Sequence, residues 1–188
     1  MYIEHKMPSQ TDRDLVRQAR QGHTEAYGEL VQNYQSLVFN VCYRLMGELR
    51  EAEDMTQETF LHAFRHLGQY DPDRPFAAWI RRVATNLCIN QYQTHKIDSL
   101  PFDEELEKPV PGDPLTPEAV QLQAEKSEKV RAAICSLPPV YRVVIELRHF
   151  QDLSYTEIAE QLNLPLSDVK SHLFRARRLL VEKLRPYE

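Results

Sequence analysis

A basic segment near the end of the chain has the side-chain types that a DNA groove requires. Residues 165–185 hold six Lys and Arg residues against two Asp and Glu residues. Four apolar residues in it recur at spacings of four, three and four, which predicts one buried face of a helix. They are Val169, Leu173, Ala176 and Leu180. The opposite, outward face, here called the basic face, consists of Lys170, Ser171, Phe174, Arg175 and Arg178.

The chemistry of the basic face suits the major groove of DNA. Lysine and arginine hydrogen bond to guanine edges and phosphates, and a ring such as that of Phe174 can contact thymine methyl groups. Arg177 and Arg185 are expected to face the DNA backbone or water. Taken alone, the helix has an alternative interpretation as a solvated basic surface with a half-buried phenylalanine.

The residues before this helix favour the DNA-binding interpretation. A short helix is predicted over 155–162, opened by the capping box Ser154-Tyr-Thr-Glu157. A tight turn follows, and Ser167 is predicted to cap a longer helix over 168–184. A short helix, a turn and a longer basic helix form the helix-turn-helix arrangement.

A second candidate surface lies in the first half of the chain. Polar and acidic side chains there share one side of a predicted helix with a leucine, and this acidic face consists of Asp54, Gln57, Glu58 and Leu61. Carboxylates repel phosphates, so the acidic face predicts a contact with another protein rather than with DNA. An ordinary solvated acidic surface is the alternative.

A third candidate surface combines aromatic, cationic and amide side chains, which is what binding of single-stranded DNA requires. Rings stack on exposed bases, cations follow the backbone, and amides hydrogen bond to base edges. The candidates are Arg74, Phe76, Trp79, Arg81, Arg82, Asn86 and Asn90. For Trp79, burial in the core beside Ile80 and Val83 is the preferred interpretation, because large aromatic residues are usually well buried.

Helical periodicity dominates the chain and predicts an all-α fold of two small domains. The first domain, residues 1–96, has predicted helices at 12–21, 25–46, 50–67 and 75–95. Gly22, Gly47 and Gly68 are expected to end helices in the left-handed conformation. Residues 97–117 are rich in proline and acid and predict a flexible linker, after which Thr116-Pro117 restarts a helix.

The second domain, residues 118–188, adds a helix at 139–150 to the helix-turn-helix. The net charge of −5 is unevenly distributed, since residues 93–126 hold three Lys and Arg residues against eight Asp and Glu residues. The acidity of the whole chain therefore does not argue against DNA binding.

Several classes of protein find no support in the sequence. The polar N-terminus and the lack of a long apolar run favour a cytoplasmic protein. Cys42, Cys88 and Cys135 are far apart and are expected to be buried, reduced thiols rather than zinc ligands. His62 and His66 lack an obvious third ligand, and no phosphate loop or nucleophile motif occurs. No metal, cofactor or enzymatic activity is predicted.

Together the two halves resemble the extracytoplasmic-function (ECF) group of the sigma-70 family, an all-α family with a region 2 helical bundle and a region 4 helix-turn-helix. The segment 52–60, AEDMTQETF, looks like the region 2 signature that docks on the polymerase clamp helices. The segment 76–86, FAAWIRRVATN, looks like the part that melts and reads the minus-ten element. LPPVYR at 137–142, YTEIA at 155–159 and VKSHLFRAR at 169–177 look like region 4 and its recognition helix.

The resemblance implies a bacterial alternative sigma factor that directs promoter-specific initiation in a stress or envelope response. Its implied partners are core RNA polymerase, through the clamp helices and the flap, promoter DNA and an anti-sigma factor. The acidic face would hold the clamp, the segment 70–90 would capture bases of the melted minus-ten strand, and the basic face would read the minus-thirty-five element. The linker would follow the path towards the RNA exit channel. Lys170 stands where arginine is common in the family, which affects the base preference.

An alternative function is a stand-alone helix-turn-helix regulator whose N-terminal bundle senses a ligand or dimerises. It explains residues 127–188 equally well. It does not explain the acidic face or the aromatic and basic stretch at 70–92. An enzyme with a helical DNA-binding domain is a third class, but no catalytic constellation supports it.

Overall fold

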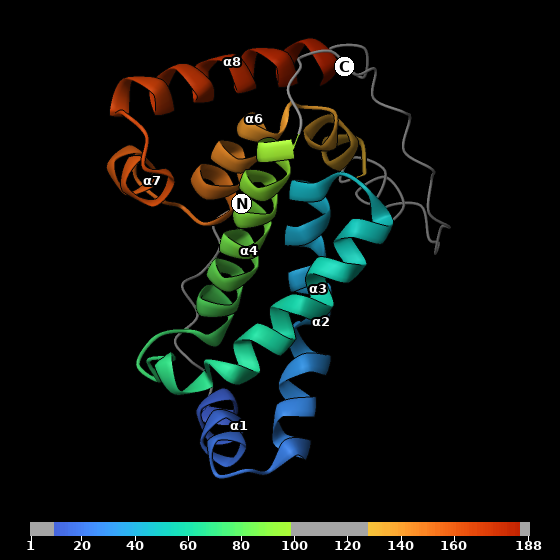
Figure 1. Cartoon of the computed structure of the whole chain (residues 1–188), viewed down its shortest axis with the longest axis vertical. Coiled ribbons are helices and arrows are strands. Elements are labelled where there is room, and N and C mark those ends of the chain that lie inside the picture. The colour runs from blue at the N-terminus through green and yellow to red at the C-terminus, as the bar shows by residue number, and fades with distance from the viewer. Residues whose placement is uncertain (1–9, 99–127, 185–188) are drawn as a thin grey trace. The chain divides into compact units, whose positions relative to one another are not determined.

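A computed structural model of the chain describes residues 10–98 and 128–184, and all regular structure within them is helical (Figure 1). The prediction of an all-α fold is confirmed. The described residues form two compact units. One consists of the residues up to Tyr43 and of Leu49–Gln91, and the other of Arg44–Glu48 and the residues from Tyr92 onward. None of the described helices is long and apolar enough to cross a membrane.

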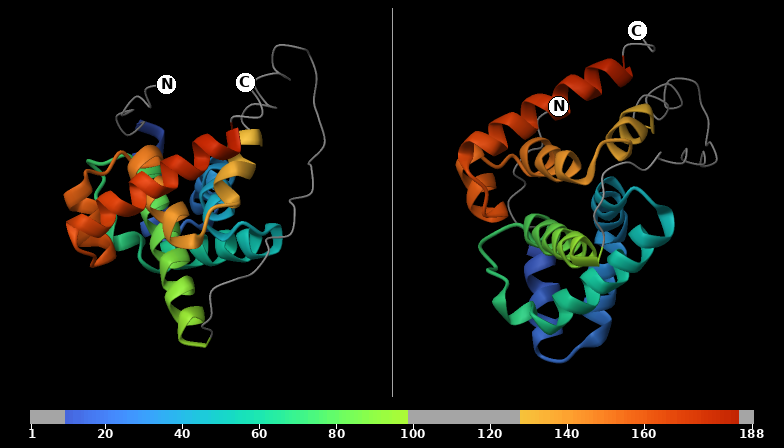
Figure 2. Two further views of the ribbon diagram at one scale, coloured as in Figure 1. Left: turned by 90° about the horizontal axis from the view of Figure 1, so that it is seen from above. Right: turned by 45° about the horizontal axis from the view of Figure 1, so that its top comes forward.

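The first unit is built from four α-helices and one short 3-10 helix, seen from two further directions in Figure 2. They are α1 (Gln10–Arg20), α2 (Thr24–Met46), α3 (Leu49–Arg65), η1 (Leu67–Gln69) and α4 (Phe76–Asp98), with the ends of α2 and α4 assigned to the second unit. These bounds agree with the predicted helices to within a few residues.

The core of the first unit follows directly from helical spacing. Phe76, Ile80, Ala84 and Cys88 occupy every fourth position of α4, and all four are fully buried. Such a row lies along one side of a helix, which must then face other elements. Leu30, Val38 and Val41 of α2, each at most 1% exposed, complete this core.

The second unit contains the helix-turn-helix. Its described elements are a helical segment at 128–135, then α6 (Pro139–Ile145), η2 (Glu146–Phe150), α7 (Tyr155–Leu162) and α8 (Leu166–Leu184). The helix α8 packs against both α6 and α7 (Figure 1). Val144, Leu147, Ile158 and Leu173 are at most 1% exposed and form the centre of this packing.

Three local predictions differ from the structure. The helix predicted at 139–150 is an α-helix only to Ile145 and continues as the π-helical turn η2. The last helix begins at Leu166, so Ser167 lies inside its first turn and is not its cap. Gly22 and Gly47 have positive φ angles of 96° and 85°, as predicted, but Gly68 lies in η1 and does not. The predicted linker from Ser99 onward and the helix start at Thr116 lie outside the described residues.

Candidate nucleic-acid and protein interfaces

The basic face of α8 is open to solvent. Lys170, Ser171, Phe174, Arg175 and Arg178 are all exposed, and residue Phe174 is 69% exposed. A phenylalanine so exposed is unusual on a solvated helix, because burial of its ring would be favourable. The alternative of a half-buried Phe174 is therefore wrong. Nε of Arg178 lies 3.2 Å from Oε1 of Glu182, so this guanidinium is paired with a carboxylate on the same helix.

Local hydrogen bonds define the two ends of α7, the helix that precedes α8. In the predicted capping box, the amide of Glu157 donates to Oγ of Ser154 at 3.2 Å, and the amide of Ser154 donates to Oε2 of Glu157 at 2.7 Å. Asn163 ends α7 in the left-handed conformation, with φ of 51°. Of the four residues predicted to form the buried face of α8, Val169, Leu173 and Ala176 are buried, whereas Leu180 is half-buried.

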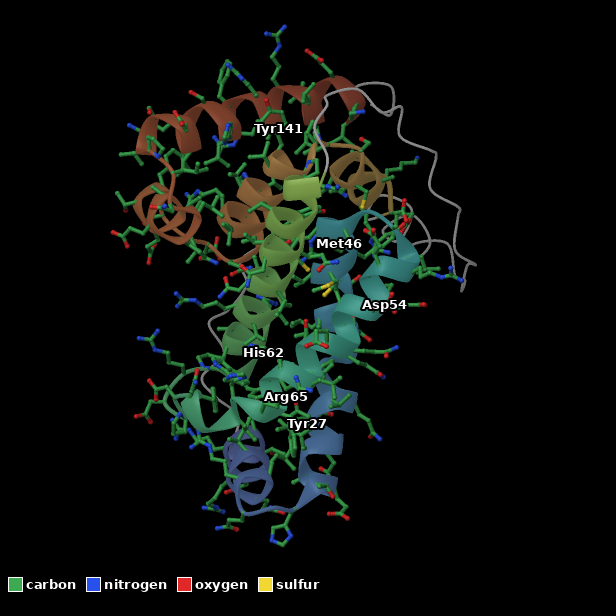
Figure 3. The ribbon with its side chains drawn as sticks, in the orientation of Figure 1. Tyr27, Met46, Asp54, His62, Arg65 and Tyr141 are labelled. Atoms are coloured by element: carbon green, nitrogen blue, oxygen red, sulfur yellow. The ribbon has the colours of Figure 1, made fainter. Side chains whose placement is uncertain are left out.

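The acidic face lies on the outer side of α3, where Figure 3 labels Asp54. All four of its residues are exposed, Leu61 to 53%. Carboxylates beside an exposed leucine can bind a surface that combines cations with aliphatic stems. Phe64, 45% exposed, extends the apolar part by one turn, and its ring lies 4.8 Å from that of Tyr27.

A hollow of about 510 Å³ adjoins the acidic face between α2 and α3. It is lined by Gln35, Ser36, Phe39, Asn40, Glu53, Thr56 and Gln57. Phe39 stacks on Tyr43 with an interplanar angle of 6°, which holds its ring at the hollow. Residues on α2 were not predicted for this surface. Helical periodicity locates a buried face, but it does not show which neighbouring helix shares an exposed groove.

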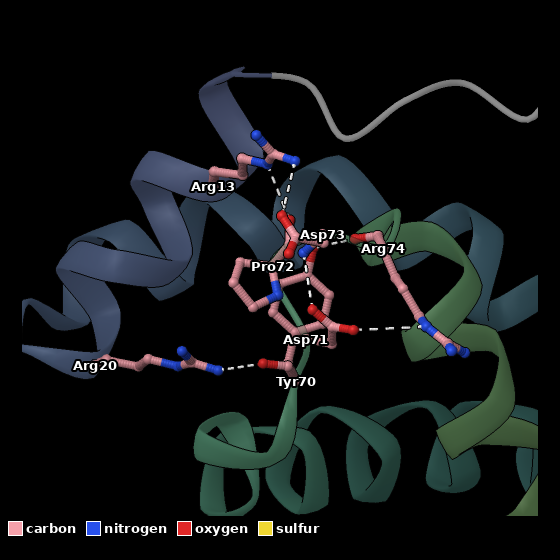
Figure 4. A network of polar contacts seen from close by, with 7 residues as sticks. All are labelled: Arg13, Arg20, Tyr70, Asp71, Pro72, Asp73 and Arg74. Atoms are coloured by element: carbon pink, nitrogen blue, oxygen red, sulfur yellow. Dashed lines mark hydrogen bonds and ion pairs between the residues drawn. The ribbon is translucent and has the colours of Figure 1, made fainter.

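Two arginines of α1 hold the loop before α4 (Figure 4). The guanidinium of Arg20 donates to the carbonyl oxygens of Leu67 at 2.8 Å, of Gly68 at 3.3 Å and of Tyr70. Nε of Arg13 donates to the carbonyl of Pro72 at 2.9 Å. These carbonyls lie about 50 to 60 residues along the chain from their donors, so the sequence gives no sign of the contacts. They were missed.

Within the loop, the hydroxyl of Tyr70 donates to the carbonyl of Arg74 at 2.5 Å, and the amide of Asp73 donates to Oδ1 of Asp71 at 2.9 Å. Burial raises the pKa of Tyr70, so its phenol keeps the proton that this bond requires. The side chain of Arg74 is 77% exposed, and its Nε forms an ion pair with Oδ2 of Asp71 at 3.6 Å. The loop therefore presents Arg74 to solvent from a fixed backbone.

The structure brings four of the predicted single-strand-binding residues to one side of α4. Trp79, Arg82, Asn86 and Asn90 follow one another at spacings of three or four, and the last three are exposed. Trp79 is half-buried, and its ring packs against those of Tyr70 and Phe76 at 5.4 Å. Trp79 was predicted either to lie in the core or to stack on a DNA base. Its half-buried position is compatible with both, because part of the ring packs against its neighbours and the rest stays accessible.

Phe76 and Arg81 do not join that row. Phe76 is fully buried, with its ring 5.1 Å from that of Tyr34, so it cannot stack on a base in this conformation. Arg81 follows Trp79 by two residues, which is about 200° around the helix, and it is half-buried. For Phe76 the predicted direct DNA contact is wrong in this conformation, because the residue supports the site from within the core. The direct contact of Arg81 stays a prediction.

The remaining titratable residues show no metal centre in the described parts of the chain, where no three His, Cys, Asp or Glu side chains are grouped as ligands. The rings of His62 and His66 stack at 4.1 Å, and Nδ1 of His66 lies 2.9 Å from the carbonyl oxygen of His62. Cys42, Cys88 and Cys135 are free and buried, as predicted.

Comparison with known proteins connects these surfaces. Residues 30–96 match the family model "Sigma-70 region 2", and residues 127–180 match "Sigma-70, region 4". The chain is 33% identical over 178 residues to the ECF RNA polymerase sigma factor SigW of Bacillus subtilis, covering 90% of this chain and 95% of that protein. It is 31% identical over 188 residues to the RNA polymerase sigma-H factor of Pseudomonas aeruginosa, covering 96% and 97%.

The fold is shared with solved structures. The structure of CnrH in complex with the cytosolic domain of CnrY aligns with a TM-score of 0.52 and 27% identity, covering 95% of this chain and 99% of that one. A stand-alone regulator would explain the match to region 4 but not the match to region 2, which contains the acidic face and α4. The chain belongs to the ECF group of the sigma-70 family of RNA polymerase sigma factors.

Proposed function

We propose that this sigma factor binds core RNA polymerase through the acidic face of α3 and reads its promoter with two further surfaces. The loop at 70–75 and the exposed side of α4 would read the minus-ten element, and the basic face would read the minus-thirty-five element. One observation carries the proposal. The three surfaces have different chemistry, and each is exposed on helices whose opposite sides are buried.

The acidic face and its hollow fit a helical, cationic partner such as the polymerase clamp. Asp54 and Glu58 supply negative charge, and Leu61 supplies exposed apolar surface. The hollow beside Gln57 offers a recess of about 510 Å³ for a partner side chain. An apolar anchor surrounded by polar contacts is the usual arrangement at the centre of a protein interface.

For the minus-ten element, the row on α4 offers a partly accessible ring and three polar side chains. Trp79 can stack on a base extruded from the duplex, while Arg82 follows the backbone and Asn86 hydrogen bonds to a base edge. The neighbouring Arg74 adds a cation from the fixed loop. Binding of the extruded bases would offset the free energy of unstacking them.

For the minus-thirty-five element, the proposal places α8 in the major groove. Arg175 and Lys170 would contact base edges and phosphates, and Phe174 would contact thymine methyl groups. Lysine lacks the two-pronged guanidinium of arginine, so Lys170 makes a less directional contact with guanine.

An anti-sigma protein is a further proposed partner. The related CnrH was solved in complex with the cytosolic domain of CnrY, and it covers nearly the whole of this chain in the alignment. We propose the cytoplasm as the place of action, since the chain must meet RNA polymerase there.

Binding to core RNA polymerase tests the assignment of α3. The double variant Asp54→Ala and Gln57→Ala should weaken binding at least ten-fold, because it removes two exposed contacts at the centre of the acidic face. Glu25→Ala, an exposed acid in the first turn of α2, is the matched control and should bind normally. Affinity can be measured by fluorescence anisotropy of the labelled full chain. Unchanged affinity of the double variant would place the clamp contact elsewhere.

A further inference from the structure

Residues 71–74, just before α4, form an exposed turn between two buried aromatic residues. The amide of Arg74 donates to the carbonyl of Asp71 at 3.1 Å, and a proline occupies the second position, where its fixed φ suits a β-turn. Tyr70 before the turn is 2% exposed, and Phe76 after it is fully buried. The turn therefore has fixed ends and a tip that is open to solvent.

Hydrogen bonds within this segment maintain the internal shape of the turn. The amide of Asp73 donates to Oδ1 of Asp71 at 2.9 Å, and the hydroxyl of Tyr70 donates to the carbonyl of Arg74 at 2.5 Å. An aspartate that accepts from the amide two residues later forms an Asx-turn. Because these bonds lie within residues 70–74, they do not by themselves fix the direction in which the tip points.

Arg13 of α1 connects the tip of the turn to the rest of the first unit (Figure 4). Its Nε donates to the carbonyl of Pro72 at 2.9 Å, and its Nη2 lies 3.4 Å from Oδ1 of Asp73. One guanidinium thus contacts the backbone of one turn residue and the side chain of the next. Since the guanidinium is planar and its donors form a rigid fork, the two contacts together restrict the orientation of the tip.

The helix α1 is held near both of its ends, so Arg13 projects from a fixed support. Beside it, the carboxylate of Asp12 accepts from the hydroxyl of Tyr34 on α2 at 2.6 Å, and Asp12 is 9% exposed. Seven residues after Arg13, the guanidinium of Arg20 donates to the carbonyl of Leu67 at 2.8 Å. Seven residues span about two helical turns, so Arg13 and Arg20 lie on the same side of α1.

Solvent exposure distinguishes the contact of Arg13 from ordinary structural support. The side chains of Arg13 and Asp73 are 40% and 88% exposed, and an ion pair so open to water contributes little to the free energy of unfolding. Loss of the contact should therefore leave the unit folded and release the tip of the turn. The turn carries Arg74 and leads into the row on α4 that begins with Trp79.

We propose that Arg13 is a positioning residue for base selection at the minus-ten element. Through Pro72 and Asp73 it holds the turn so that Arg74 and the neighbouring row on α4 meet the extruded bases in one orientation. Arg13 also offsets the negative charge of Asp73, which would otherwise repel DNA phosphates. The proposal rests on the proposed reading of this element by the loop and α4. It adds α1, which lies outside the three proposed surfaces, to the determinants of promoter choice.

Open-complex formation by the holoenzyme, on fragments with single-base changes in the minus-ten element, tests this role. The ratio of apparent affinities for the native and each altered fragment, measured by permanganate reactivity, gives the base discrimination. In Arg13→Ala this ratio should fall about five-fold at one or more positions, which is the scale of one weakened base contact. Arg17→Ala removes the same charge one turn further along α1 and should leave the ratio unchanged.

Two further measurements separate a folding defect from a change in base selection. Trp79 is the single tryptophan of the chain and packs against Tyr70 and Phe76, so its emission reports on both ends of the turn. Arg13→Ala should retain the emission spectrum, the midpoint of thermal unfolding and the affinity for core polymerase. Arg13→Lys keeps the charge but lacks the forked donor, so it should not restore discrimination.

Several results would overturn the proposal. An equal loss on every fragment, with the slope of log affinity against log salt lowered by about 1, would mean that Arg13 itself binds a DNA phosphate. Unchanged discrimination in Arg13→Ala would mean that the turn is oriented without α1, and full discrimination in Arg13→Lys would reduce the role to charge. A shifted emission spectrum or a lower unfolding midpoint would make Arg13 a structural residue. If the unaltered holoenzyme melts no promoter, the proposed function fails before any variant is compared.

Discussion

Phe174 and Phe76 serve the proposed DNA surfaces in opposite ways. Phe174 remains 69% exposed on α8, where its ring is available for the groove. Phe76 is fully buried and packs against Tyr34, Tyr70 and Trp79, so it supports the residues that face solvent. Their sequence neighbours, Arg175 after Phe174 and Ala77 after Phe76, do not show which of the two rings is exposed. Only the packing of neighbouring helices separates an aromatic residue that contacts a ligand from one that holds it in place.

The exposure of a side chain could be predicted from the sequence where it depends only on the position of the residue around its own helix. The five residues of the basic face follow from the spacing of the apolar residues on α8, and all five are exposed. Prediction failed where a second element intervenes. Phe76 is buried by neighbouring helices, and the three carbonyls that receive Arg20 come from a distant turn.

Protonation of His149 should couple DNA binding to pH. In the free protein, partial burial of the ring, and then the charges of Arg177 and Arg148, lower the pKa of His149, while Asp152 acts in the opposite direction. A DNA phosphate beside the ring would favour its charged form, so the complex would take up a proton. Affinity for promoter DNA should therefore rise as the pH falls from 8 towards the range just below the ordinary histidine value, about 6.

The measurement is holoenzyme–DNA affinity at several pH values for the unaltered chain and for His149→Gln. The glutamine variant should show a flatter pH dependence, and it should lose most affinity at the acidic end. Identical pH profiles for the two proteins would mean that His149 does not meet a phosphate.

At the scale of the elements, α1 acts as a support for the loop that precedes α4. Arg20 donates to three carbonyl oxygens, so its loss would leave strong acceptors without their charged donor. Arg20→Ala should lower the free energy of unfolding by about 1–2 kcal/mol. It should also reduce promoter melting more than core polymerase binding, because the loop carries Arg74 and leads into Trp79.

Thermal unfolding and permanganate reactivity of minus-ten thymines measure the two effects. Arg17→Ala is the control, since Arg17 is exposed and its guanidinium pairs with the nearby Asp14 at 2.6 Å, within α1. If Arg20→Ala melts promoter DNA normally while its stability falls, α1 has a purely structural role.

Most elements could be predicted because caps and periodicity agree with the final packing. The capping box at Ser154 and the turn before α8 are local features, and the structure contains both. The π-turn η2 could not be predicted. The sequence of Glu146–Phe150 gives no local sign of wider hydrogen bonds, and its Leu147 is buried as in an ordinary helix. The chain reversal at Asp152 adds to this tertiary effect.

At the scale of the whole molecule, two units with separate proposed DNA-binding surfaces belong to one chain. Binding of one unit to a promoter holds the other nearby, which raises its effective concentration at the second element. Weak contacts in each unit can then produce specific binding of the pair. The net charge of −5 is consistent with a chain that depends on the polymerase and not on overall charge for DNA binding.

Run-off transcription with core RNA polymerase from the source organism, on DNA upstream of this protein's own gene, tests whether the chain is a promoter-specific initiation factor. We expect a discrete transcript that requires this chain and that Asp54→Ala with Gln57→Ala strongly reduces. Co-elution of the chain with core enzyme in the same sample distinguishes an unsuitable promoter from a failure to bind. Neither a transcript nor co-elution would contradict the proposed function.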